Sequence, residues 1–293
     1  AANFKEPELD LSPSDAEAET LELLRTASAE HNDFGRWLHS NVRPHRLPQL
    51  RSVILSFKRV GFAPGDATAD QMDAAADLAD KFSHGELRVT HEQNLLLPWV
   101  RRDQLPELYK AAKALGLAKA NIGLLTDMIA CPGGDFCSLA NARSLPIAEA
   151  ITERYQDLDE LWDLGEIDLH ISGCINSCGH HHSGHIGILG VDKDGKEWYQ
   201  ITLGGADGTY LSGPAQAGKI IGPSFSAAEV PGVIEALLGA YRDLREALPA
   251  EAAKAAHGQK HENFIDTVRR VGIDPFKAAA NAVRQTAHAA VSA

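Results

Sequence analysis

The sequence predicts an α+β protein of about two domains, and three observations support this prediction. First, 293 residues can bury a large core, and a domain usually holds about 100 to 200 residues. Second, short runs of branched and aromatic residues alternate with Ala-rich stretches that carry apolar residues at helical spacing. Third, 44% hydrophobic and 23% charged residues is an ordinary globular composition. No apolar run approaches the roughly 20 residues of a membrane span, so no membrane association is expected.

The first domain is expected over residues 33–120, after a polar arm or linker formed by residues 1–32. Residues 52–57 (SVILSF) predict a strand, and a helix is predicted from Thr68 to Phe82 after the turn signal APGD. Two further strands fit ELRVTH and NLLLPWV, and a helix fits LPELYKAAKALG up to its glycine. The order strand, helix, strand, strand, helix is most of a ferredoxin-like αβ sandwich.

The second domain is expected over residues 121–248 and has an α/β pattern. IGLLTDMIA and IDLHIS predict strands that each lead into a cysteine-bearing loop, and SLANARSLPIAEAITERY between them predicts a helix. Pro146 should kink or split that helix because proline removes a backbone hydrogen bond. HIGILGVDKDGKEWYQITLGG predicts a hairpin that turns at DKDG, and AAEVPGVIEALLGAYRDLREAL predicts an amphipathic helix. Residues 249–293 are expected to be an Ala-rich helical tail.

The four cysteines fall into two pairs, and four kinds of chemistry compete for them. Cys131 and Cys137 form C-x5-C, Cys174 and Cys178 form C-x3-C, and 36 residues separate the pairs. Disulfides fit an unsecreted chain poorly, because the cytosol is reducing, and zinc pairs favour spacings of two to four residues. Four unrelated buried thiols are also possible. Four thiolates from two loops are what an iron-sulfur cluster needs, which makes the cluster the favoured interpretation.

The surroundings of the cysteines agree with a cluster. Glycines flank both pairs and would let the backbone turn close to the sulfurs and point N–H groups at them: Gly133, Gly134, Gly173 and Gly179. Cys137 is expected to open a helix, where the positive end of the helix dipole favours a thiolate.

Charge is distributed unevenly along the chain. The net charge of -12 argues against generic nucleic-acid binding, which depends on clustered Lys and Arg. Residues 34–65 nevertheless contain no Asp or Glu, and they hold six Lys and Arg and two His: Arg36, His39, Arg43, His45, Arg46, Arg51, Lys58 and Arg59. This acid-free segment is either a solvated face or an anion site.

The cysteine pattern resembles that of the siroheme-dependent sulfite and nitrite reductases. C-x5-C is followed after 36 residues by G-C-x-N-x-C-G, and GELRVTHEQNLLLPWV is similar to that family's strand pair with its T-x-x-Q-N element. ANARSLPIAEAI and YQITLGG are similar to the segments after each pair, and ISGCINSCGHHHSGHIGILGVDK is closest to the bacterial assimilatory branch. The resemblance covers roughly residues 33 to 275 and corresponds to the C-terminal half of the haemoprotein.

The resemblance implies two cofactors and their ligands. Cys131, Cys137 and Cys174 would bind a 4Fe-4S cluster, and Cys178 would bridge the cluster and the siroheme iron. Asn176 would contact the macrocycle. The eight carboxylates of siroheme need donors, and the expected donors are four residues of the strand pair, two arginines and one histidine: Arg88, Thr90, Gln93, Asn94, Arg43, Arg46 and His180. No role is predicted for His181, His182 or His185, and a second metal at these histidines is disfavoured.

The resemblance also implies an activity and partners. Sulfite would be reduced to sulfide, or nitrite to ammonia, in the cytoplasm with electrons from a ferredoxin or a flavoprotein. Family members consist of two similar halves, and this sequence resembles the second, so a separate N-terminal half or a second copy of the chain is expected as a partner. The alternative is an iron-sulfur electron-transfer or cofactor-binding module without turnover of its own. No catalytic residue is predicted.

Overall fold

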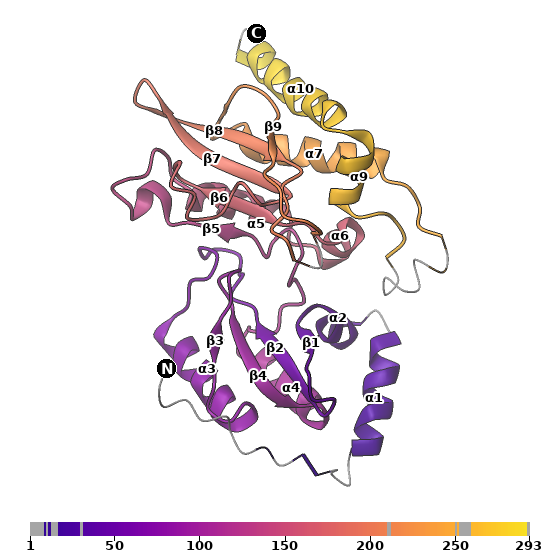
Figure 1. The fold of residues 1–293 in the computed structure, drawn as a ribbon. Helices are drawn as coiled ribbons and strands as arrows, with labels where there is room; N and C mark the ends of the chain where they lie inside the picture. The colour runs from indigo at the N-terminus through magenta and orange to yellow at the C-terminus, as the bar shows by residue number, and fades with distance from the viewer. Residues whose placement is uncertain are drawn as a thin grey trace. The chain divides into compact units, whose positions relative to one another are not determined.

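The computed structural model describes residues 9, 11–12, 17–29, 32–209, 212–249, 251 and 259–291. The chain divides into two compact units (Figure 1). The first contains residues 1–57 and 65–122, and the second contains residues 58–64 and 123–293. The short segment 58–64 therefore groups with the second unit although the first unit flanks it on both sides in the sequence.

The first unit is built on a four-stranded antiparallel sheet with the strand order β1-β2-β4-β3 (Figure 1). Its elements are α1 (Glu17–Ala29), α2 (Asp33–Ser40), β1 (Val42–Pro44), β2 (Leu50–Leu55), α3 (Ala69–Phe82), β3 (Arg88–Val89), β4 (Leu95–Arg101), η1 (Arg102–Gln104) and α4 (Leu105–Ala114). The predicted order β2, α3, β3, β4, α4 is confirmed. Helix α3 begins where predicted because Thr68 and Gln71 form a capping box that satisfies two free N–H groups.

The region expected to be a polar arm contains a packed helix. In α1, Leu24 and Ala27 are buried, and the helix packs against α2. Leu24 joins the core of the first unit, which also contains Trp37, Val53 and Leu97. The expectation of a linker is therefore wrong for residues 17–29, because the helix buries apolar side chains on one face.

The second unit has a mixed sheet with the order β10-β8-β7-β6-β5, and β9 pairs with β8. Strands β5, β6 and β7 run parallel to one another. Strand β8 runs antiparallel to both of its neighbours, β7 and β10. Its elements are β5 (Ile129–Ala130), η2 (Gly133–Asp135), α5 (Leu145–Arg154), α6 (Leu158–Leu164), β6 (Leu169–Ser172), β7 (Ile186–Lys193), β8 (Lys196–Leu203), β9 (Lys219–Ile220), β10 (Phe225–Ser226), α7 (Val230–Leu244), α9 (Phe264–Val271) and α10 (Asp274–Val291). The hairpin predicted at DKDG is confirmed as β7 and β8.

Two local predictions in the second unit are wrong. Only Ile129–Ala130 of IGLLTDMIA is a strand. The residues before it form turns, in which the N–H of Gly123 donates to the Asp127 carboxylate. The helix predicted from residue 138 begins only at Leu145. Cys137 therefore opens no helix, and Pro146 sits in the first turn of α5, where its missing N–H costs nothing.

The C-terminal region packs into the core of the second unit. Helix α7 packs against α5, α9 and α10, as Figure 1 shows for the yellow C-terminal helices. Phe264 and Phe276 are fully buried in the same cluster as Tyr241. The tail expected from the sequence is thus helical, and it contributes to the stability of this unit. Within the described residues, no helix is both long enough and apolar enough to span a bilayer.

Candidate functional site

The two cysteine pairs lie at the same edge of the second sheet. Strands β5 and β6 are parallel neighbours, so the loops that follow them leave the sheet side by side. Cys131 follows β5, and its N–H donates to the carbonyl of Ile171 in β6 (3.1 Å). The N–H of Gly173, directly after β6, donates to Sγ of Cys131 (3.1 Å). A sulfur of the first pair is therefore hydrogen-bonded to the loop that carries the second pair.

Backbone hydrogen bonds hold the first cysteine loop against Gly173. The N–H groups of Asn141 and Ala142 both donate to the carbonyl of Gly173, at 2.9 and 3.0 Å. A Cβ atom on Gly173 would lie only 2.6 Å from the carbonyl oxygen of Ala142 and 2.8 Å from Cα of Gly133. Glycine at position 173 is thus required because two backbone segments approach each other, and this approach also delivers an N–H to a sulfur.

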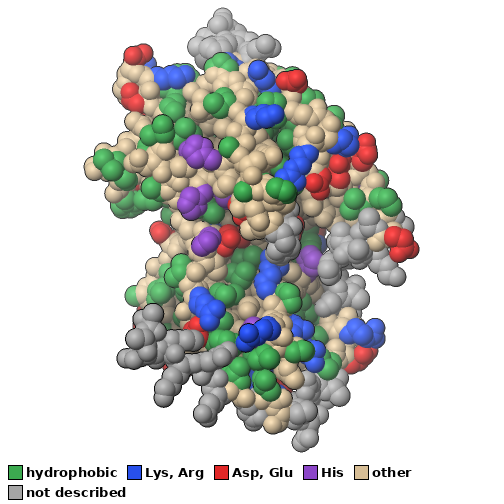
Figure 2. Space-filling model, in the orientation of Figure 1, with side chains coloured by type: hydrophobic (Ala, Val, Ile, Leu, Met, Phe, Trp, Pro, Cys, Tyr) green, Lys and Arg blue, Asp and Glu red, His purple; other side chains and the backbone are tan. Residues whose placement is uncertain are grey.

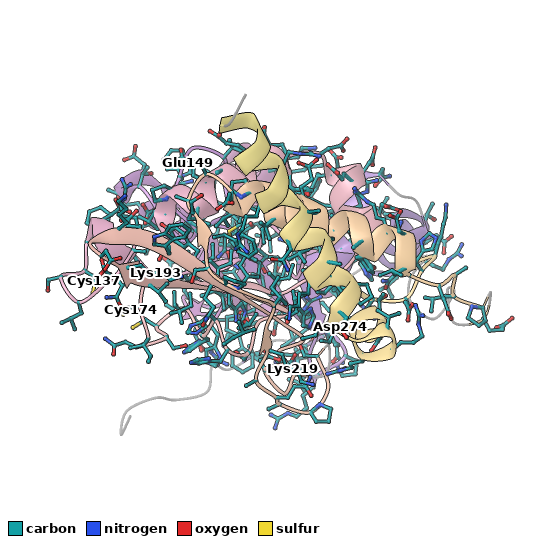
Figure 3. All side chains as sticks on the ribbon, turned by 90° about the horizontal axis from the view of Figure 1, so that it is seen from above. Cys137, Glu149, Cys174, Lys193, Lys219 and Asp274 are labelled. Carbon is teal, nitrogen blue, oxygen red and sulfur yellow. The ribbon has the colours of Figure 1, made fainter. Side chains whose placement is uncertain are left out.

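The four sulfurs differ in their exposure to solvent. All four cysteines are free thiols: Cys174 is buried, Cys131 and Cys137 are partly buried, and Cys178 is exposed. Cys137 follows the short turn η2, where its N–H donates to the carbonyl of Gly133 (2.9 Å). Figure 3 shows Cys137 and Cys174 at the same end of the sheet as Lys193, whereas Lys219 lies toward the other end. Cys178 is the sulfur open to a further ligand.

The loop around Cys178 adopts an uncommon backbone conformation. Ser177 and His180 have positive φ angles of 57° and 53°, which few residues other than glycine adopt. Gly179 anchors the loop to β6, since its N–H donates to the Ser172 hydroxyl (3.1 Å). Asn176 and His180 are exposed beside Cys178. Both predicted cofactor contacts are therefore accessible to solvent, as Cys178 is.

The other histidines divide into buried and exposed groups. His185 is 2% exposed, and Asp168 and Ser212 surround its Nε2 at 3.4 and 3.1 Å. His181 is 1% exposed, with Nδ1 at 3.1 Å from the Ser177 hydroxyl, while His182 is exposed. The two buried imidazoles thus contact neighbouring side chains, and His181 contacts the loop of the second cysteine pair through Ser177.

We expect His181 to make the stability of the fold depend on pH. Burial, with smaller contributions from His182 and His170, lowers the pKa of His181 from 6.5 to about 4. The folded state therefore keeps the imidazole neutral where the unfolded state binds a proton, so stability should fall as the pH drops from 6.5 toward 4. Thermal melting at about pH 7 and about pH 5 checks this. His181→Gln should show a smaller drop, and an equal drop in both proteins would contradict the assignment.

The remaining predicted contacts belong to the first unit. Arg43 is partly exposed and donates to the carbonyl of His39 (3.3 Å), and Arg46 is exposed. Arg88 is exposed and paired with Glu86 (2.6 Å). Figure 2 shows Lys and Arg side chains beside hydrophobic ones on the visible face of this unit. Arg43 and Arg46 thus lie at or near the surface of this unit, and Arg88 has a carboxylate partner.

The T-x-x-Q-N element is a tight turn between β3 and β4. The N–H of Thr90 donates to the carbonyl of Asn94 (3.0 Å), and the Thr90 hydroxyl accepts the N–H of Asn94 (3.2 Å). Asn94 is 2% exposed, and its Oδ1 accepts the N–H of Phe57 (3.0 Å). Gln93 has a positive φ of 58° and is partly buried. Thr90 and Asn94 therefore have structural roles in the turn that the sequence interpretation did not include.

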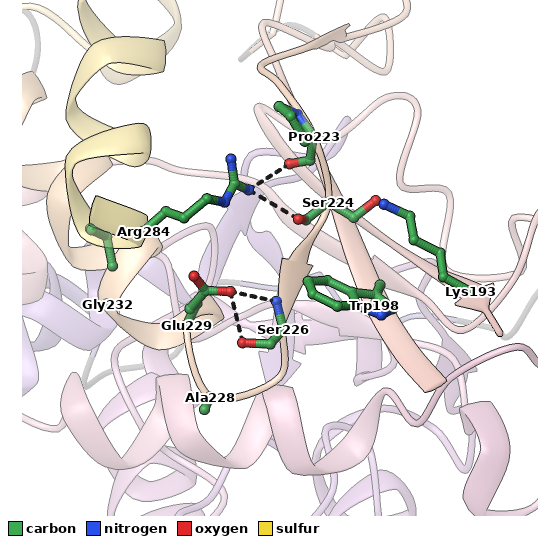
Figure 4. Close-up of a pocket in the computed structure, with 10 residues that line it drawn as sticks. Lys193, Trp198, Pro223, Ser224, Ser226, Ala228, Glu229, Gly232 and Arg284 are labelled. Carbon is green, nitrogen blue, oxygen red and sulfur yellow. Dashed lines mark hydrogen bonds between the residues drawn. The ribbon is translucent and has the colours of Figure 1, made fainter. Parts of the chain in front are cut away.

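One cavity has no lining residue from the cysteine loops. It has a volume of about 670 Å³ and is lined by residues of β7, β8, β10, α7 and α10 (Figure 4). Arg284 donates to the carbonyls of Pro223 and Ser224, and Glu229 accepts hydrogen bonds from Ser226. No residue predicted as a site lines it. Within the described part of the chain, no three His, Cys, Asp or Glu side chains lie close enough together to form a metal site as they stand. This includes the four cysteines, so binding a cluster requires the two cysteine loops to bring their sulfurs closer together.

Comparison with protein families assigns both units. Residues 56–115 match the nitrite/sulfite reductase ferredoxin-like half domain. Residues 124–286, more than half of the chain, match the nitrite and sulphite reductase 4Fe-4S domain. The chain belongs to the nitrite and sulphite reductase family. Family membership implies an iron-sulfur cluster and confirms the predicted α+β architecture with its ferredoxin-like half domain.

Curated members of the nitrite and sulphite reductase family match over part of their length. The chain is 30% identical to the chloroplastic ferredoxin–nitrite reductase of Spinacia oleracea, over 64% of this chain and 32% of that protein. It is 31% identical to the assimilatory ferredoxin-dependent nitrite reductase of Haloferax mediterranei, over 63% and 32%. It is also 31% identical to sulfite reductase [ferredoxin] 1 of Mycolicibacterium paratuberculosis, over 51% and 29%. The chain thus spans about a third of the length of these relatives.

Solved structures of reductases share the fold. The NirA protein of Mycobacterium tuberculosis superposes with a TM-score of 0.59 at 23% identity, over 81% of this chain and 41% of that chain. Dissimilatory sulfite reductase I gives a TM-score of 0.58 at 16% identity, over 79% and 69%. At these identities the likeness shows a common fold alone.

Proposed function

We propose that this chain is the cluster- and siroheme-binding part of an assimilatory sulfite or nitrite reductase. The observation that carries the proposal is the sulfur arrangement: two loops at one sheet edge are joined by the hydrogen bond from Gly173 to Cys131, and only Cys178 is exposed. Cys131, Cys137 and Cys174 would ligate the 4Fe-4S cluster, and Cys178 would be shared with the siroheme iron.

The donor set fits these cofactors chemically. Four free thiols supply one soft anionic ligand for each iron of a cubane, and the Gly173 N–H stabilises the negative charge on one of them. The exposed Asn176 and His180 can contact a macrocycle that reaches Cys178. When bound, the cluster would supply electrons one at a time and siroheme would bind the anion to be reduced. The protein ligates, orients and adjusts local charge.

The proposed partners follow from the relatives. Several are named as ferredoxin-dependent enzymes, so we propose that a ferredoxin, or a flavoprotein in its place, donates electrons to this chain. Because the chain matches about a third of these relatives, we propose that an N-terminal half or a second copy completes the site. The cytoplasmic location stays a prediction.

Anaerobic purification tests the proposal directly. Iron, sulfide and siroheme are quantified per chain, and methyl-viologen-dependent reduction of sulfite and nitrite is measured with and without a candidate N-terminal half. We expect a siroheme absorption band together with about four sulfides and about five irons per chain, one of the irons being that of siroheme. A cluster spectrum without siroheme would support an electron-transfer module instead, and a colourless protein with stoichiometric zinc would overturn the whole proposal.

Charge reversal at Arg43 or Arg46 should weaken siroheme retention. Each substitution removes a cation that can donate a charge-assisted hydrogen bond to a siroheme carboxylate. Such a bond is worth about 1.5–3 kcal/mol, so siroheme retention should fall about tenfold or more. Cluster content should not change, because the cysteines lie in the other unit. Lys110→Glu, an exposed lysine on α4, is the matched control. Unchanged siroheme occupancy in both arginine variants would contradict the assignment.

A further inference from the structure

The segment 58–64 brings two cations to the unit that holds the cysteines. The residues that flank the segment are hydrogen-bonded to each other, since the N–H of Gly65 donates to the carbonyl of Phe57 (3.0 Å). The segment itself groups with the second unit. Lys58 is 2% exposed, and its ammonium donates to the carbonyl of Met128 (2.7 Å). Met128 lies three residues before Cys131, so their Cα atoms are at most about 11 Å apart.

The neighbouring cation, Arg59, has two buried nitrogens without an acceptor. Among the described residues, neither Nε nor Nη2 of Arg59 has a hydrogen-bond partner, and both atoms are inaccessible to solvent. Its guanidinium carbon lies 3.8 Å from the ring centroid of Phe62. The aromatic face compensates only part of the cost of burying a charge, because it accepts no hydrogen bond in the guanidinium plane.

The two nitrogens form the edge of the guanidinium that binds carboxylates. Nε–H and Nη2–H point in the same direction and match the two oxygens of a carboxylate. Arg101 in this chain uses the same edge, with Nε at 3.1 Å and Nη2 at 3.0 Å from the two carboxylate oxygens of Asp103. Phe62 lies over the Arg59 guanidinium and limits its movement. Because protein atoms cover the edge in this structure, a ligand reaches it only when the segment 58–64 moves.

We propose that the Nε and Nη2 edge of Arg59 binds a two-oxygen anion, and that this anion is a carboxylate of siroheme. The inference rests on the proposed function and names a residue for it in the second unit. Lys58 holds the segment beside the strand that delivers Cys131, and Phe62 lies over the guanidinium. A free oxyanion such as sulfite or phosphate shares the chemistry, so the experiment must separate the two sources.

The first measurement is siroheme retention in the full-length chain, purified anaerobically. Arg59→Gln should lower the siroheme-to-cluster ratio about tenfold or more, while sulfide per chain stays unchanged and iron per chain falls only by the one atom that siroheme carries. Arg59→Lys, which keeps the charge but loses the two-pronged edge, should lie between that variant and the parent chain. Lys196→Gln at the β7–β8 hairpin is the charge-matched control and should retain siroheme fully.

The second measurement is the melting temperature of the siroheme-free chain. A cation that awaits a ligand stabilises nothing in the free protein, so Arg59→Gln should leave the melting temperature unchanged or raise it. A clear fall in the melting temperature would show that Arg59 has a structural role and would overturn the inference.

The third measurement identifies the source of the anion. The siroheme-free parent chain and its Arg59→Gln variant are titrated calorimetrically with sulfite and with inorganic phosphate. We expect the same result for both proteins, with no binding site that depends on Arg59. Loss of such a site, with siroheme retention unchanged, would overturn the siroheme assignment in favour of a free oxyanion. Full siroheme retention with no oxyanion site would overturn the inference altogether. Absence of siroheme from the parent chain would contradict the proposed function itself.

Discussion

Replacing Cys131 by alanine is expected to abolish the iron-sulfur cluster. Cys131 is held by two hydrogen bonds to the strand and loop of the second pair, from its own N–H to Ile171 and from Gly173 to its sulfur. Removing an outer partner of a metal ligand already costs about 10–100-fold in affinity, and removing the ligand itself costs more. Iron and sulfide per chain, with the visible absorption of the cluster, measure the effect.

Ser144→Ala is the matched control for this cysteine. The Ser144 hydroxyl lies 3.4 Å from Sγ of Cys131 and is buried like its surroundings, but it is not a ligand. Its removal should weaken cluster binding by about tenfold, the low end of that range, because the contact is long, whereas Cys131→Ala should leave no cluster. A Cys131→Ala chain that keeps four irons and four sulfides would refute the cluster assignment.

Gly179→Ala is expected to destabilise the second unit and to displace Cys178. A Cβ atom at position 179 would lie 2.0 Å from the carbonyl oxygen of Ile171 and 2.8 Å from its carbon, so the loop must move away from β6. Overpacking of this kind costs up to about 3 kcal/mol, which lowers the melting temperature by about 6–12 °C in a unit of this size. Siroheme retention should fall together with stability.

Gly239→Ala is the control that separates the steric clash at position 179 from the general effect of adding a methyl group. Gly239 lies within α7, and nothing approaches the position of its Cβ within 4 Å. Alanine there should stabilise the chain by about 0.5–1 kcal/mol, because it restricts the unfolded backbone. Equal melting temperatures for the two variants would show that the contact at Gly179 relaxes without cost.

Local sequence signals predict those elements whose first or last residues form a cap or a turn. The helix α3 begins at a capping box, and the β7–β8 hairpin turns at Asp194 and Gly195, both with positive φ. The stretch IGLLTDMIA lacked such signals. Its Leu124, Leu125 and Met128 are buried as a strand's would be, but in turns, and an apolar run does not distinguish a buried strand from a buried loop.

In the candidate site, too, some features follow from local sequence and others only from the fold. The spacing of the four cysteines and the glycines beside them indicate a cluster from the sequence alone. The sequence could not show that Thr90 and Asn94 hold a turn together, since their hydrogen-bond partners depend on the register of β3 and β4. Nor could it distinguish Arg59 from Arg101, because an arginine is paired or unpaired according to the acceptors that the fold brings near it.

The amino-acid order alone specifies which side chains can bind iron and where most helices and strands begin, because both depend on neighbours a few residues away. The folded chain decides that β5 and β6 lie side by side, which brings Gly173 to Cys131 across 41 intervening residues. It also decides that Cys178 faces outward and that the Arg59 edge meets no carboxylate among the described residues. These features arise from long-range strand pairing and burial, which minimise the free energy of the whole unit rather than of any local segment.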